Sequence, residues 1–155
     1  PTIRSRCVSF AIAPVSPADC ARYCTAHGVD KKTAALYSEL FDGHIGTVLT
    51  AARDKARTEQ VDKAMELARA AQAGDSYTAA VLLAPYEKDK AGAAALLRDL
   101  RAVAAAGLQG SPHAPVQGQQ AQRTLRLAEA AIQRLGAQVN PKIVLTVFAA
   151  RLAHA

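Results

Sequence analysis

The sequence has few aromatic residues, no tryptophan and only three cysteines. Phe, Tyr and Trp together make up 5% of the 155 residues, while hydrophobic residues overall reach 50%. A chain of this length and hydrophobic content can bury a core, which excludes an intrinsically disordered protein. Because alanine supplies much of the apolar content, helices with small side chains at their contacts are favoured. The composition therefore predicts an all-α fold.

Three cysteines are too few, and too clustered, for a disulfide framework, so reduced thiols and a cytoplasmic location are expected. Cys20 and Cys24 lie one helical turn apart. A zinc site needs about four ligands, and no further pair of Cys or His has a suitable spacing. We therefore expect no metal and no cofactor. Cys20, Tyr23, Cys24 and His27 instead predict the buried stripe of a helix.

Long apolar runs are also missing. No stretch of about 18 apolar residues and no secretory leader pattern is found, so the sequence supports neither membrane spanning nor secretion. The net charge is +6 and the pI is near 9.5. Residues 1–57 hold 8 Lys and Arg against 5 Asp and Glu, and residues 58–155 hold 11 against 8. This even division indicates a mixed surface rather than a dedicated basic patch.

Three short helices are predicted in the first 57 residues. Ser16-Pro17-Ala18-Asp19 combines a capping serine, a proline in the first turn and an acidic residue, and the helix that it begins should stop at Gly28. Asp30 caps a second helix that ends at Asp42-Gly43. A third helix follows this glycine and ends at the charged run 53–57.

After a boundary near residues 56–59, the pattern changes to five longer, alanine-rich helices. Gly74-Asp75, Pro85 and Gly107 interrupt them, and the Gly- and Pro-rich stretch 107–118 is expected to be a mobile loop. Asn140-Pro141 begins the last helix. The positions expected to face inward are Val61, Ala64, Met65, Ala68, Ala93, Leu96, Leu97, Leu100, Ala104, Ala121, Leu125, Ala128, Ile132, Leu135, Ile143, Val144, Val147, Phe148 and Leu152.

The first seven residues carry the most specific motif. Thr2-Ile-Arg-Ser-Arg-Cys7 leads into an apolar run over 8–13 that has the pattern of one strand, and no partner strand follows. With no initiating Met, this arrangement predicts a piece of a longer protein. On the residue pattern alone, Arg6 is either an exposed basic residue at the end of a strand or a guanidinium that stabilises charge on a phosphate.

This segment resembles the small subunits of the bacterial DNA polymerase III clamp loader. In that family the Ser-Arg-Cys motif closes an ATPase-like domain, and its arginine reaches the nucleotide site of a neighbouring subunit. The resemblance implies that Arg6 acts as an arginine finger in trans in the intact complex. The ending Ala137-Gln-Val-Asn-Pro-Lys142 and the helix after it resemble the family's closing Asn-Pro helix.

The segment Gly43-His-Ile-Gly46 is glycine-rich, but it lacks the Gly-Lys-Ser/Thr ending of a phosphate-binding loop and no strand precedes it. It therefore predicts a turn between helices. In the clamp-loader family this position resembles the start of the third lid helix, where ATP-binding members carry an arginine that senses nucleotide. Gly46 stands there, which favours the delta-prime type over the tau/gamma type.

Other candidates for chemistry are weak. The histidines, His27, His44, His113 and His154, have no nucleophile or carboxylate at a meaningful spacing. Arg98-Asp99 is either a surface ion pair or a contact between subunits. No pattern of paired catalytic carboxylates is present. We therefore expect that this chain alone is not an enzyme and does not hydrolyse ATP.

Taken together, the resemblance implies two parts. Residues 1–57 would be the end of the ATPase-like domain and an AAA+ three-helix lid, and residues 58–155 a five-helix collar through which subunits assemble. The partners implied are the other subunits of a hetero-pentamer and, through the complex, the sliding clamp and primed DNA during replication. The alternatives are the same region of a tau/gamma ATPase subunit and an unrelated basic helical module that binds nucleic acid or protein.

Overall fold

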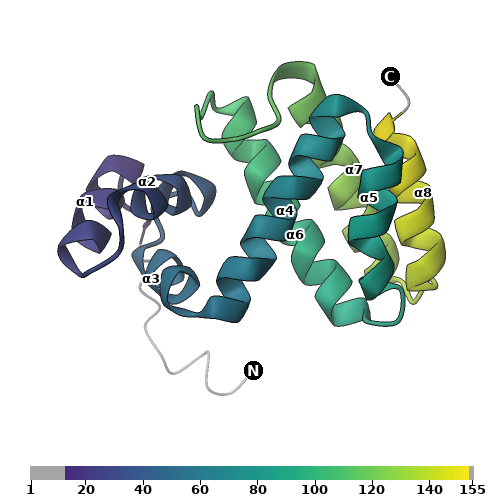
Figure 1. Ribbon diagram of the computed structural model, residues 1–155, viewed down its shortest axis with the longest axis horizontal. Coiled ribbons are helices and arrows are strands. Elements are labelled where there is room, and N and C mark those ends of the chain that lie inside the picture. Colours follow the sequence, from purple (N-terminus) through teal and green to yellow (C-terminus); the bar gives the residue numbers. More distant parts are fainter. Residues whose placement is uncertain (1–12, 154–155) are drawn as a thin grey trace, which may run out of the picture.

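Every regular element in residues 13–153, the part that the computed structural model describes, is helical (Figure 1). The all-α class is therefore confirmed for this part of the chain. The strand expected over residues 8–13 lies, apart from Ala13, outside the described residues. The elements are α1 (Pro17–Ala26), α2 (Lys31–Leu40), α3 (Ile45–Arg53), α4 (Lys55–Ala73), α5 (Ser76–Leu83), a 3₁₀ turn η1 (Ala84–Tyr86), α6 (Lys90–Leu108), α7 (Gly118–Gly136) and α8 (Pro141–Ala153).

Side-chain caps fix where the helices begin. The Ser16 hydroxyl accepts a hydrogen bond from the Asp19 amide at 3.1 Å, and Asp30 accepts one from the Thr33 amide at 2.8 Å, as the sequence predicts. Asp75 caps α5 in the same way, and its carboxylate also accepts a bond from the Thr78 hydroxyl at 2.6 Å. That hydroxyl, ahead of the backbone amide, lowers the pKa of Asp75.

The first three helices enclose a small core. Cys20 and Cys24 of α1 are fully buried in it, and burial is the main cause that raises the pKa of Cys24 to about 11. Tyr23 and His27 were expected in the same stripe, and this is wrong. Their rings stack on the surface with centroids 4.0 Å apart, and Tyr23 is 44% exposed. In this ten-residue helix only the two thiols, which lie four residues apart, face the core.

The other five helices form a second bundle around leucine and alanine side chains. Figure 1 shows α1–α3 at one end of the molecule and α5 and α8 together at the other, with α4 running between the two ends. The helices α6 and α7 have the most extensive contact with each other. The expected stripe of α4 is buried, as are the inward positions of α6. The largest fully buried side chains here include Val61, Leu67, Leu83, Leu96, Leu97, Leu100, Leu135 and Leu152.

The two bundles are joined without a loop. Asp54 is at once the last residue flanking α3 and the cap of α4, where it accepts a bond from the Ala56 amide at 2.9 Å. The boundary expected near residues 56–59 therefore falls inside the first turns of α4. A division of the chain into two domains at this place stays a prediction.

The last helix agrees with expectation at three inward positions and differs at others. Val144, Phe148 and Leu152 are buried as predicted, but Ile143 is 58% exposed and Val147 is only half-buried. Leu145 takes an inward position that the sequence reading missed. Because α8 is apolar on nearly all sides, its sequence does not indicate which face is buried. The contacts of α8 with α5 and α7 determine that face.

Gly107 does not break α6, as the sequence suggested, but lies inside its last turn. The chain returns over it, and a Cβ at this position would lie 1.9 Å from the carbonyl oxygen of Val116. Val116 and Ala114 are buried, and the Gln117 side chain donates to the Ser111 carbonyl at 3.2 Å. The connection between α6 and α7 is thus packed against the bundle, which disagrees with the mobile loop that its composition indicated.

Gly107→Ala is expected to destabilise the protein by about 1–3 kcal/mol, the usual cost of an overpacked contact, although alanine favours helix more than glycine does. Chemical unfolding followed by circular dichroism measures this change. Gly136→Ala is the matched control, since no atom lies within 4 Å of the corresponding Cβ position. If the Gly107 variant is as stable as the natural sequence or more stable, the backbone at Val116 can move away from the added methyl group without lowering the free energy of unfolding.

Candidate protein-interaction surface

Few of the residues singled out in the sequence come together. Arg6, the candidate arginine finger, and His154 lie outside the described residues. His27, His44 and His113 are exposed at separate helix ends and loops. Among residues 13–153 no group of three or more His, Cys, Asp or Glu side chains is placed to hold a metal ion.

The glycine-rich segment 43–49 forms the turn before α3 and its first residues, as predicted. His44 precedes the helix without a side-chain capping bond. Gly43 has φ +72°, and a Cβ there would meet the Val15 carbonyl oxygen at 1.7 Å, so the approach of residues 13–15 requires glycine. Gly46 is different, because no atom lies within 4 Å of its Cβ position. An arginine would fit at 46, so packing does not force the glycine.

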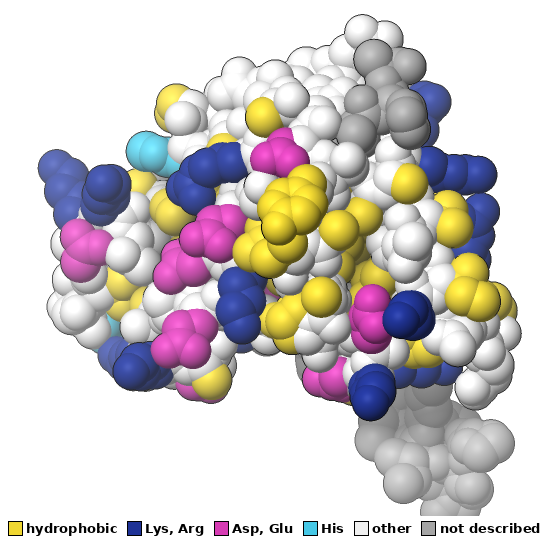
Figure 2. Space-filling view, turned by 45° about the vertical axis from the view of Figure 1, so that its right-hand side comes forward, with side chains coloured by type: hydrophobic (Ala, Val, Ile, Leu, Met, Phe, Trp, Pro, Cys, Tyr) yellow, Lys and Arg dark blue, Asp and Glu magenta, His cyan; other side chains and the backbone are white. Residues whose placement is uncertain are grey.

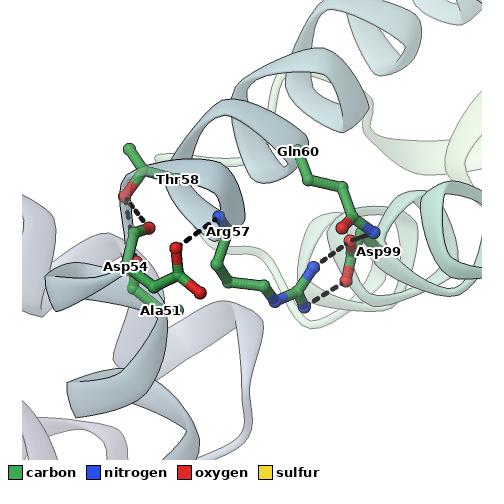
Figure 3. Close-up of polar contacts among 6 residues, drawn as sticks. All are labelled: Ala51, Asp54, Arg57, Thr58, Gln60 and Asp99. Atoms are coloured by element: carbon green, nitrogen blue, oxygen red, sulfur yellow. Dashed lines mark hydrogen bonds and ion pairs between the residues drawn. The ribbon is translucent and has the colours of Figure 1, made fainter. Parts of the chain in front are cut away.

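Asp99 has a role that the sequence did not indicate. It is neither a surface partner of Arg98 nor exposed: its side chain is 8% exposed, and Arg57 of α4 donates two hydrogen bonds to its carboxylate (Figure 3). Gln60, one turn further along α4, adds a third bond at 2.8 Å. Arg98 points to solvent instead. The pairing needs 42 residues of intervening chain to fold back, so no local spacing could reveal it.

Arg57 also contacts the first bundle. Its guanidinium carbon lies 5.6 Å from the centre of the Phe41 ring at the end of α2, within the range of a cation–π contact. The hydrogen bond to Asp99 is the first cause that raises the pKa of Arg57. One side chain therefore links α2, α4 and α6, close to the place where the two bundles are joined.

A second polar contact spans the same gap. The Ser111 hydroxyl, in the connection between α6 and α7, donates to the Glu39 carboxylate of α2. Ser111 is itself 8% exposed. Two contacts, one through Arg57 and one through Ser111, thus hold the first bundle against the second.

An apolar groove lies on the outside of the molecule between α5 and α8. It has a volume of about 360 Å³, and Tyr77, Ala80 and Ala84 form one wall. Leu145, Ala149 and Ala150 are among the residues of the other wall. Figure 2 shows hydrophobic side chains gathered on this side of the five-helix bundle, with charged side chains of both signs around them.

Three apolar side chains of α5 and α8 are unusually exposed for their type, and one of them, Tyr77, lines the groove. Tyr77 is 78% exposed, Ile143 58% and Val81 54%. Tyr77 and Val81 lie one helical turn apart on α5, so they form one continuous apolar edge. We call the groove, together with the exposed side chains Tyr77 and Val81 of α5 and Ile143 of α8, the α5–α8 surface.

A signal for this surface was present in the sequence. The segment 76–83, Ser-Tyr-Thr-Ala-Ala-Val-Leu-Leu, is apolar around most of its circumference, yet only Ala79 and Leu83 are buried within the chain. A helix that is hydrophobic on all sides is usually buried on all sides. In α5, by contrast, one side remains exposed to solvent. Exposed apolar patches with a polar rim mark sites of contact with other proteins.

Within residues 13–153 no helix is long and apolar enough to cross a lipid bilayer. Comparison of the chain with protein-family models, with curated proteins and with solved structures finds no match.

Proposed function

We propose that this chain is the C-terminal part of a clamp-loader subunit of the delta-prime type, and that it serves the assembly of the subunit ring which loads a sliding clamp during DNA replication. The observation that carries the proposal is the order of the bundles. A compact three-helix bundle is followed directly by a five-helix bundle, with a continuous connection at Asp54. The Thr2–Cys7 motif and the Asn140-Pro141 helix start support the same assignment.

In this proposal the α5–α8 surface is where a neighbouring subunit packs. An exposed tyrosine beside a groove with apolar walls is typical of a residue that dominates binding energy, because tyrosine buries a large area at a low cost in side-chain entropy. The delta-prime type, rather than tau/gamma, is proposed because Gly46 stands where an arginine would fit without steric conflict. An intact phosphate-binding loop encoded upstream would contradict that choice.

Tyr77→Ala is expected to weaken binding to the cognate clamp-loader subunits by about 30-fold, the effect of losing an interaction worth 2 kcal/mol. Titration of the labelled chain with reconstituted partner subunits measures the change. Tyr23→Ala is the matched control, since Tyr23 is an exposed tyrosine of the other bundle. Because Tyr77 is mostly exposed, both variants should unfold at nearly the same temperature as the natural sequence.

Undiminished binding by the Tyr77 variant would remove the α5–α8 surface from the proposal. Failure of the unaltered chain to bind any clamp-loader subunit would contradict the proposed function as a whole. The two results are distinguishable because the second does not involve a substitution.

A further inference from the structure

The positive charge of the chain is concentrated in its last three helices. Residues 1–89 hold 11 Lys and Arg against 11 Asp and Glu, whereas residues 90–155 hold 8 against 2. A division at residue 57 hides this difference, because it groups the acidic residues of α4 and of the segment 75–89 with the arginines of α6 to α8. The whole net charge of +6 therefore belongs to the segment from α6 onward.

Even these two acidic residues leave little negative charge on the surface. Asp99 is buried against Arg57. Glu129 is half-exposed on α7, and its carboxylate lies 3.8 Å from the Arg101 guanidinium. The charged side chains exposed on α6, α7 and α8 are thus nearly all basic.

The arginines of these helices share one side of the bundle. On α7, the Gln and Arg residues at 119, 122, 123, 126, 133 and 134 recur at helical spacing on the outward side, where Ala130 and Glu129 fill the turn between 126 and 133. The contact between Arg101 and Glu129 places α6 along one edge of this face. At the other edge, Arg123 donates to the Arg151 carbonyl of α8 at 2.8 Å. The arginine face, as we call it, comprises Arg101 of α6 and Arg123, Arg126 and Arg134 of α7.

The geometry of this face suits a row of phosphates. Arg123 and Arg134 are separated by about 17 Å along α7, at 1.5 Å per residue. A duplex carries about ten phosphates over that length, at one charge per 1.7 Å of its axis. Arg123 and Arg126 border a depression of about 450 Å³ that is otherwise lined mostly by glutamines. Guanidinium groups bind phosphate oxygens in a bidentate manner, and Gln side chains also donate to the phosphate backbone.

We propose that the arginine face binds the phosphate backbone of double-stranded nucleic acid, without reading its sequence. This is a direct contact of the chain with a duplex, and it does not depend on the proposed place in a clamp loader.

The chemistry of the face favours a duplex over other acidic partners. The only Phe, Tyr or Trp from residue 90 onward is Phe148, which is buried, so the face offers no aromatic ring on which an unpaired base can stack. The absence of an exposed aromatic residue also disfavours a protein interface, which is usually anchored by one. The apolar side of α7 lies in the core of the bundle and is not available to enter a membrane.

The test compares two double variants that lose the same charge. Arg126→Gln with Arg134→Gln alters the arginine face at exposed positions, and Lys31→Gln with Lys32→Gln alters exposed positions of α2. Glutamine keeps a high helix propensity, so both variants should fold, which thermal melts verify. Binding of the full chain to a fluorescent 25-base-pair DNA duplex is measured by anisotropy over a range of salt concentrations.

The unaltered chain is expected to bind the duplex with an affinity that falls steeply with salt. In the arginine double variant, affinity at low salt should fall by about tenfold or more, and the slope of log Kd against log salt should decrease by about 2. The lysine double variant should bind nearly as the unaltered chain does. An equal loss in both variants would show that net charge alone drives binding, and would overturn the proposal.

Two further probes separate the duplex from other polyanions. Single-stranded DNA of the same length and polyglutamate should both bind more weakly than the duplex, since one lacks paired backbones and the other lacks phosphates. Tighter binding of the single strand would overturn the assignment of a duplex. Polyglutamate that binds as tightly as the duplex, through the same two arginines, would reassign the face to an acidic protein.

Discussion

Arg57→Ala is expected to lower the free energy of unfolding by about 3–5 kcal/mol, the usual effect of removing one partner of a buried ion pair. The reason is the position of Asp99, whose side chain is only 8% exposed and would be left with Gln60 alone. The variant also loses the contact of Arg57 with the Phe41 ring. Urea unfolding followed by circular dichroism gives the free energy directly.

Arg98→Ala serves as the control for Arg57→Ala, because it removes an arginine that is next to Asp99 in sequence but directed to solvent. It should change stability by no more than about 0.5 kcal/mol. The double variant Arg57→Met with Asp99→Leu should recover most of the loss, since apolar side chains of similar size can replace a buried pair. A loss below 1 kcal/mol for Arg57→Ala would mean that water reaches Asp99 and that the pair is not a buried one.

Phe148→Ala is expected to cost about 3–5 kcal/mol, the typical effect of truncating a buried phenylalanine. Phe148 is 2% exposed in the core of the second bundle, so it belongs to the fold and not to a contact with a neighbouring subunit. For a chain of this size each kcal/mol shifts the melting temperature by about 2–4 °C. A thermal melt of the chain alone should therefore show a fall of about 10 °C.

Ile143→Ala is the matched control on the same helix, since Ile143 is 58% exposed. It should leave the melting temperature within a degree or two of the natural value. The pair of variants also checks which side of α8 is buried, since the sequence correctly assigned Phe148 to the core but wrongly assigned Ile143 to it. Equal shifts for the two variants would contradict the burial that distinguishes them.

The helix starts show how far the sequence alone reaches. Ser16 and Asp30 were identified as caps because a cap bonds to an amide two or three residues away, so that the whole interaction lies within one turn. The inward faces of α4 and α6 were predicted for a similar reason. Each has polar residues on one side and apolar residues on the other, and such a pattern selects the buried side.

Where this contrast fades, the prediction failed. Tyr23 was assigned to the core of α1 and is on the surface, and Ile143 was assigned to the core of α8 and is exposed. Both helices carry apolar residues on more than one side, and the sequence does not state which side meets a neighbour. The prediction that Gly107 breaks a helix was wrong for a different reason. Gly107 lies close to the backbone of Val116, nine residues later in the chain, and no local pattern indicates that contact.

The sequence by itself determined the all-α class, the order of the helices and the caps Ser16 and Asp30. The excess of positive charge in residues 90–155 is also a property of the sequence, although the expectation of an evenly mixed surface overlooked it. These properties depend on neighbours within a few residues or on composition. Only the tertiary structure decided that Arg57 pairs with Asp99, that Tyr77 of α5 and Ala149 of α8 line one apolar groove, and that Arg101 of α6 lies beside the arginines of α7. Such features join residues that are tens of positions apart, and the packing of the helices brings them together.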